Sequence, residues 1–196
     1  MLHQQKKYRY IVLLAVILVL SLFLSGCGEK EEAEQAVQPN EPFTASTSAY
    51  EDGGRIDIKH TLRDQNISIP ITWSNAPADT KSFAIIMYDL HEIAGNWVHW
   101  AVKDIPANIT GLPEGVSGTD QLPTGSKELR NTFGSTGYGG PQPPKGSGDH
   151  EYKIIVYALN TELLEIADNP SFKLFEKLVE PFVLASAEFS GFYENK

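Results

Sequence analysis

Cysteine is nearly absent, because the chain of 196 residues contains a single one, Cys27. One thiol cannot close an intramolecular disulfide or build a cysteine-rich zinc site. Positive charge is also scarce: 16 Lys and Arg stand against 25 Asp and Glu, which leaves a net charge of -9. Binding the phosphate backbone of a nucleic acid needs the opposite sign, so no nucleic-acid partner is expected.

Enzyme motifs are missing as well. The sequence has neither a G-x-S-x-G nucleophile motif nor a Walker-type phosphate loop. We therefore predict no catalytic residue, no cofactor and no metal site. In contrast, 41% hydrophobic and 10% aromatic residues exclude a wholly disordered chain. The length suits one folded domain with appendages.

The N-terminus has the features of an export signal. Basic residues at Lys6, Lys7 and Arg9 precede an apolar run from Ile11 to Leu24. This run is too short to span a membrane, for which a helix needs roughly 20 residues. The ending Leu-Ser-Gly-Cys27 resembles the bacterial lipobox, in which the cysteine is acylated and becomes the mature N-terminus. We predict a lipoprotein signal peptide at 1–26; an uncleaved signal anchor is the alternative.

An acidic segment follows the cysteine. Residues 27–42 contain five Glu and two Pro with few apolar residues, a composition that keeps a chain extended and solvated. We predict a flexible tether over 27–42 and a folded domain over 43–196. Acylation of Cys27 would place this domain outside the cytoplasm, in the cell envelope, anchored to a membrane by lipid.

The domain is predicted to be mostly β, an antiparallel sandwich of short strands separated by turns. Runs typical of strands occur at 43–48, 67–73, 82–88, 97–102, 152–159 and 182–189. One short peripheral helix is expected after Asn169 and Pro170, which offer an N-cap and a first-turn proline. Its apolar stripe, from Phe172 to Val179, indicates a face that packs on the sheets.

Candidate binding residues gather in two stretches. In the first, Asp89 and His91 lie at a strand end, and Trp97 and His99 share one face of the next strand. In the second, a loop rich in Gly and Pro over 134–148 precedes His150 and Tyr152, which also share one face. Imidazoles, a phenol and loop N–H groups suit an oxyanion such as phosphate. The alternative is that each histidine is structural and the loop is only a loop.

The same residues resemble a known family, the phosphatidylethanolamine-binding proteins, in their bacterial Raf-kinase-inhibitor-like branch. Ordered matches cover nearly the whole domain: Tyr50-Glu-Asp-Gly-Gly54, Trp73-Ser-Asn-Ala-Pro77, Trp97-Val-His-Trp100, Gly137-Tyr-Gly-Gly-Pro141 and Pro143-Pro-Lys-Gly-Ser-Gly148. The resemblance implies a Greek-key β-sandwich with one or two short peripheral helices. It also implies a small cavity that accepts phosphate-like groups.

Carried over to this sequence, the family's cavity falls on six positions. Asp89 matches the first acid of the Asp-Pro-Asp-x-Pro motif. The cavity wall, first histidine, loop wall, second histidine and adjacent tyrosine match Trp97, His99, Pro143, His150 and Tyr152. We add His91 as a further candidate, because it replaces the second acid of that motif.

The chain departs from the family's pattern at several positions. Leu90 and Ile93 replace the motif's two prolines, and Phe182 replaces a histidine near the last strand. Gln142 stands where bacterial members often have Cys. Glu151 replaces the usual Arg, so an acid became His91 while a base became Glu151. We hypothesise that these two residues form a reversed ion pair across the cavity rim; independent drift is the alternative.

Three functions remain open. The first is a binding protein for a small anionic or phosphorylated ligand, anchored to the membrane through Cys27. The second is an inhibitor or interaction partner of an envelope protease or another enzyme, with the protein partner unknown. The third is a hydrolase that uses Asp89 with His99 or His150 as acid and base, although it lacks a nucleophile.

Overall fold

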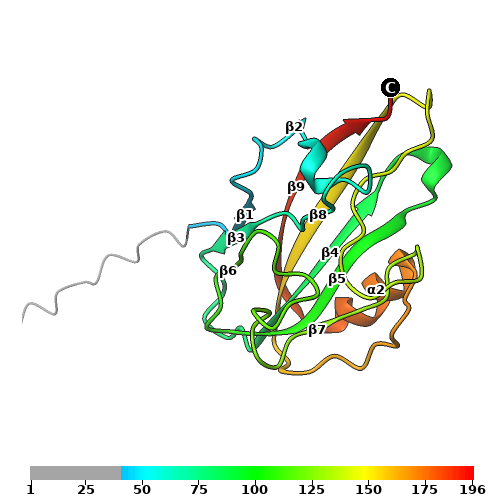
Figure 1. Cartoon of the computed structure of the whole chain (residues 1–196). Helices are drawn as coiled ribbons and strands as arrows, with labels where there is room; N and C mark the ends of the chain where they lie inside the picture. The colour runs from blue at the N-terminus through cyan, green and yellow to red at the C-terminus, as the bar shows by residue number, and fades with distance from the viewer. Residues whose placement is uncertain (1–40) are drawn as a thin grey trace, which may run out of the picture. The chain divides into compact units, whose positions relative to one another are not determined.

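The computed structural model describes residues 41–196, which form a mostly β architecture of two sheets (Figure 1). The predicted signal peptide, Cys27 and nearly all of the predicted tether lie outside the described residues. The larger sheet contains, in spatial order, β2 (Gly54–Arg55), β9 (Val183–Glu194), β8 (Asp149–Leu159), β4 (Ser82–Asp89), β5 (Trp97–Pro106) and β7 (Lys127–Glu128). The smaller sheet contains β1 (Thr44–Ser46), β3 (Ile71–Ser74) and β6 (Gly111–Leu112).

The predicted β-sandwich is confirmed. After the antiparallel pair β4–β5, the chain makes a long connection and returns as β8 on the free side of β4, as in a Greek key. One pair is parallel, since β2 runs alongside β9 in the same direction. Most of the domain separates these two strands in sequence, so no tight hairpin fixes them as antiparallel.

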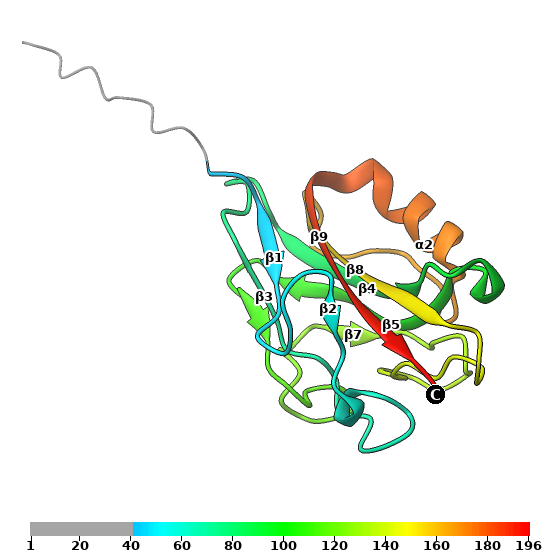
Figure 2. The ribbon, with the colours of Figure 1, turned by 90° about the horizontal axis from the view of Figure 1, so that it is seen from above.

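The larger sheet is buried on both faces (Figure 2). One face of β4, with Phe83 and Ile85, contributes to a core that also holds Trp73 of the smaller sheet. Its other face, with Ile86, contributes to a second core that holds Phe175 of α2 (Phe172–Val179). Every residue of β4 is buried, which explains its continuous apolar run.

The helix begins later than predicted. Ser171, not Asn169, is the N-cap, and its hydroxyl accepts a hydrogen bond from the Leu174 N–H. The predicted packing face is confirmed, because Phe175 and Val179 are fully buried against the sheet. The helix stops before Pro181, which lies in the short 3-10 turn η3 (Glu180–Phe182).

The predicted strand over 67–73 is wrong in its first half. Pairing in β3 starts only at Ile71, immediately after Pro70, which has no N–H to donate to a neighbouring strand. The segment before it holds the 3-10 turn η1 (Ile58–His60) and irregular backbone. Within residues 41–196, no helix is both long and apolar enough to cross a membrane.

Candidate functional site

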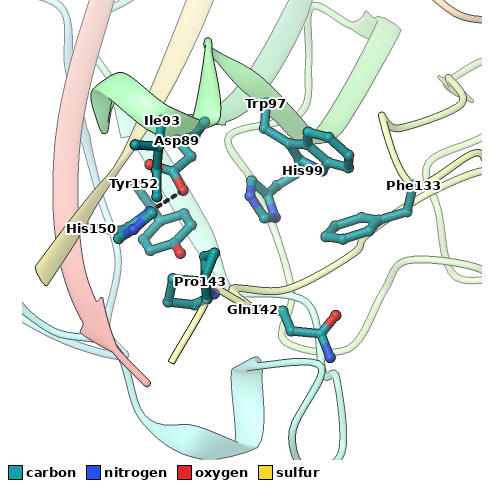
Figure 3. Close-up of a pocket in the computed structure, with 11 residues that line it drawn as sticks. Asp89, Ile93, Trp97, His99, Phe133, Gln142, Pro143, His150 and Tyr152 are labelled. Atoms are coloured by element: carbon teal, nitrogen blue, oxygen red, sulfur yellow. Dashed lines mark hydrogen bonds and ion pairs between the residues drawn. The ribbon is translucent and has the colours of Figure 1, made fainter. Parts of the chain in front are cut away.

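A cavity of about 260 Å³ opens where β4, β5 and β8 meet the loop before β8 (Figure 3). Six of the seven predicted domain residues line it, namely Asp89, Trp97, His99, Pro143, His150 and Tyr152. In Figure 3 they surround one space, with Pro143 facing the strand residues from the loop side. This volume suits a small head group rather than a large organic molecule.

Each carboxylate oxygen of Asp89 accepts a hydrogen bond from a neighbouring N–H group. Asp89 ends β4 opposite Tyr152 of β8, and it is buried. Its Oδ2 accepts from Nδ1 of His150 at 2.6 Å, and its Oδ1 accepts from the backbone N–H of His91 at 2.9 Å. On the far side of the His150 ring, Nε2 lies 2.9 Å from the Ser147 hydroxyl. Asp89 therefore fixes the orientation of the His150 ring.

A β-bulge aims His99 into the site. In the β4–β5 ladder, Met87 pairs with Trp100 while Tyr88 pairs with Val98, so His99 is an extra residue without a partner. Such a bulge re-aims side chains where a strand approaches a binding site. Trp100, next in sequence, is fully buried in the core between the sheets.

The imidazole of His99 has a fixed proton position. Its Nδ1 donates to the Gly139 carbonyl at 2.5 Å, because a carbonyl oxygen can only accept. The side chain is buried, and this burial lowers its pKa to about 4 against the opposing effects of that hydrogen bond and the Asp89 charge. The ring is therefore neutral near pH 7, and Nε2 is an acceptor.

The loop opposite reaches His99 only because it contains two glycines. A Cβ on Gly139 would lie 2.8 Å from the Phe133 ring, and one on Gly140 would lie 2.1 Å from the His60 carbonyl oxygen. Close backbone approach of this kind excludes any side chain. The Tyr138 hydroxyl, which donates to the same His60 carbonyl at 2.7 Å, holds the loop down.

Two further polar groups of the cavity have no partner among the described residues. The Tyr152 hydroxyl is buried and makes no hydrogen bond, and neither does the Nε1–H of Trp97. Burial and the nearby Asp89 charge raise the pKa of Tyr152 above its ordinary value, so its hydroxyl keeps its proton. Buried polar groups normally have hydrogen-bond partners, so the described protein leaves these two groups unsatisfied.

His91 is not among the residues that line the cavity. Its ring stacks on that of His150, with centroids 4.0 Å apart and planes 9° from parallel. The hypothesis of a reversed pair with Glu151 is wrong: Glu151 accepts from the Ser190 hydroxyl at 2.7 Å, and no ion pair joins it to His91 within 41–196. The physical reason is strand alternation, because Glu151 leaves β8 on the face opposite His150.

The sequence reasoning missed most of the apolar mouth. Ile93 of η2 (Glu92–Ala94) is 58% exposed and Phe133 is 40% exposed, and both line the cavity together with Ala94, Gln142 and Pro144. Ile93 and Gln142 stand at positions where the chain departs from the family pattern, which was a usable signal. Phe133 gave no signal in the sequence, because its loop is held at the site by contacts between residues far apart in the chain. One is the hydrogen bond from the Val98 N–H to Thr132 Oγ1 at 2.9 Å.

The polar residues do not form a metal centre. Among the described residues, no group of three or more His, Cys, Asp or Glu side chains lies close enough to hold a metal ion. The Ser147 hydroxyl near His150 donates to the Pro144 carbonyl at 2.7 Å and does not line the cavity.

Comparison with known proteins agrees with the geometry. A family model described as phosphatidylethanolamine-binding protein matches residues 46–194. The UPF0098 protein YbcL of Escherichia coli K12 is 42% identical over 162 residues, which cover 79% of this chain and 88% of that protein. The crystal structure of E. coli YbcL, described as a member of the mammalian PEBP family, matches 80% of this chain and 100% of that one with a TM-score of 0.74 and 36% identity. A Mycobacterium tuberculosis H37Rv protein named LppC, a candidate lipoprotein, is 34% identical over 63% of this chain and 58% of that protein.

Proposed function

Because the chain belongs to the phosphatidylethanolamine-binding protein family, we propose that its cavity binds a small anionic, phosphate-like group. The observation that carries this proposal is the buried Tyr152 hydroxyl, which faces the cavity without a hydrogen-bond partner in the described part of the chain. Trp97 offers a second unused N–H group. Leaving such groups unpaired costs about 1–3 kcal/mol each, which a bound oxyanion would recover.

Little of the protein's acidic charge lies in the cavity wall. Asp89 is the only carboxylate among the described lining residues, and two N–H groups already neutralise part of its field. Glu151, the residue most adverse to anion binding in the sequence, leaves β8 on the other face and bonds to Ser190. The cavity is therefore less negative than the net charge of -9 implies.

Binding is favoured over catalysis by the state of Ser147. Its oxygen lies 2.9 Å from His150 Nε2 and 2.7 Å from the Pro144 carbonyl, so two acceptors share one hydroxyl proton, and the residue does not line the cavity. A nucleophile needs its proton directed to the base and its oxygen directed to the substrate. The Asp89–His150 pair instead shapes one wall of the cavity.

The test is calorimetric titration of residues 43–196 with inorganic phosphate. We expect binding to the wild type and a loss of about tenfold or more in affinity for both His99→Ala and His150→Ala. Asp120→Asn, a change at an exposed aspartate outside the cavity, is the control and should leave affinity unchanged. Unchanged affinity in both histidine variants would reject the proposal.

We further propose that acylated Cys27 holds the domain on the outer side of a bacterial membrane. The support is the Leu-Ser-Gly-Cys ending after a basic and apolar segment, together with similarity to a candidate lipoprotein. Two acyl signals anchor a protein stably, whereas one holds weakly. A Cys27→Ser variant should lose incorporation of an alkyne-labelled fatty acid and leave the membrane fraction. Equal labelling of both proteins would contradict the anchor.

A further inference from the structure

The unused groups of the cavity differ in the direction of their hydrogen bonds. The Trp97 Nε1–H is a donor only, and the Tyr152 hydroxyl supplies a second donor. Nε2 of His99 has the opposite requirement, because the only proton of the neutral ring is on Nδ1 and goes to the Gly139 carbonyl. A ligand that fills this cavity well must therefore accept hydrogen bonds and also donate one.

The charged and titratable side chains around the cavity do not supply the hydrogen-bond donor that Nε2 of His99 requires. Asp89 on β4 is an acceptor, and its two oxygens are occupied by His150 and by the backbone of His91. His150 on β8 uses its Nδ1 on Asp89 and directs its Nε2 to Ser147. Among the described residues the His99 ring makes its side-chain hydrogen bond through Nδ1, to the Gly139 carbonyl, and none reaches Nε2; burial keeps the ring neutral near pH 7.

We infer that the cavity selects an oxyanion that still carries a proton, and disfavours fully ionised oxyanions of the same size and shape. This inference rests on the proposed function and names its ligand class. Inorganic phosphate keeps at least one proton near neutral pH, and phosphomonoesters keep theirs below a second pKa of ~6. Sulfate has no proton in this range and presents only acceptors. It would place a negatively charged oxygen against the lone pair of His99 Nε2.

Phosphate and sulfate therefore form a matched pair of probes. At pH 7 and constant ionic strength, we expect the wild-type domain to bind phosphate at least ~10-fold more tightly than sulfate, because a buried acceptor facing an anionic oxygen is costly. His99→Gln should bring the ratio close to one, since the amide can turn its N–H toward either anion. Tyr152→Phe is the matched control: it removes a donor used by both anions, so both affinities should fall while the ratio persists.

A second measurement needs no variant. Long-range proton–nitrogen-15 spectra of the wild-type domain report which nitrogen of each imidazole carries the proton. We expect His99 at pH 7 to be protonated on Nδ1 and bare on Nε2, and a proton found on Nε2 would overturn the inference.

The outcomes separate the two proposals. Equal wild-type affinities for phosphate and sulfate overturn the selectivity and leave the anion site standing. Binding of neither anion overturns both. Preference for phosphate that persists in His99→Gln shows that another group sets the selectivity, and it overturns the role assigned to His99.

Discussion

The Asp89 carboxylate and the His150 imidazole lie 2.6 Å apart, and their hydrogen bond joins the end of β4 to the start of β8 at the cavity. Both residues are almost fully buried. Because Asp89 also accepts from the backbone of His91, one carboxylate fixes the wall of the cavity and the turn that follows β4. The sequence predicted both residues as ligand contacts, and both line the cavity, where Asp89 also holds the His150 ring in place.

Replacing the carboxylate should therefore weaken the fold at this end. In Asp89→Asn one oxygen remains for two N–H donors, so one donor faces an amide N–H instead. We expect the free energy of unfolding in urea to fall by ~1–3 kcal/mol. Asp120→Asn at an exposed position should change it by less than ~0.5 kcal/mol. Equal effects of the two substitutions would mean that the buried bonds of Asp89 contribute nothing.

Tyr152 should show the opposite balance between stability and binding. Its hydroxyl has no protein partner among the described residues, so Tyr152→Phe breaks no internal hydrogen bond and removes a buried polar group. We expect unfolding free energy to stay the same or rise slightly, while phosphate affinity falls ~10-fold. Parallel denaturation and calorimetry measure both quantities. Loss of stability with unchanged affinity would show that the hydroxyl serves the fold.

The stability of the domain should depend on pH through His99. Burial lowers the folded-state pKa of this histidine from 6.5 to about 4. Between these values the unfolded state binds more protons than the folded state, so the free energy of unfolding falls as the pH decreases from 6.5 to 4. Above pH 6.5 the domain keeps the whole contribution of the neutral His99 ring. The full contribution is ~3 kcal/mol. His99→Gln should lack this part of the decline, measured by urea unfolding at pH 7 and pH 4; identical declines would contradict the burial of a neutral ring.

The two glycines of the loop should differ in their tolerance of a methyl group. In Gly140→Ala the Cβ would meet the backbone oxygen of His60 at 2.1 Å, and backbone cannot move aside cheaply. In Gly139→Ala the contacts are side chains of Phe133 and Asn131, which can shift. We expect thermal unfolding to show a distinctly larger loss for Gly140→Ala, ~1–3 kcal/mol more. Equal losses would contradict this packing.

Strand positions and the cavity were largely predictable, and the reason is local. Alternation in β8 places His150 and Tyr152 on one face, and the apolar run within β4 has to be covered on both faces of the sheet. The family resemblance then brought Asp89 and Pro143 to the same cavity. These inferences need only the alternation of side chains along a strand and the order of the family's motifs, so the sequence alone supports them.

The errors arose where distant backbone decides the outcome. The bulge at His99 depends on pairing with β4, and the helix start depends on the hydroxyl of Ser171 rather than on the nearby Asn169. The charges of Glu151 and His91 suggested an ion pair. Alternation along β8 instead directs Glu151 to the face of the sheet opposite His150, and His91 stacks on the His150 ring. Phe133 reached the cavity from a long loop that has no periodic pattern.

We propose above all that this cavity binds a phosphate-like anion. The most direct test is a nitrogen-15 NMR titration of residues 43–196 with inorganic phosphate at pH 7. We expect the largest, saturable shifts at the backbone and indole N–H of Trp97, and at His99, Gly139 and Tyr152. Shifts that are scattered over the surface, or that leave these residues unmoved at saturating phosphate, would contradict it.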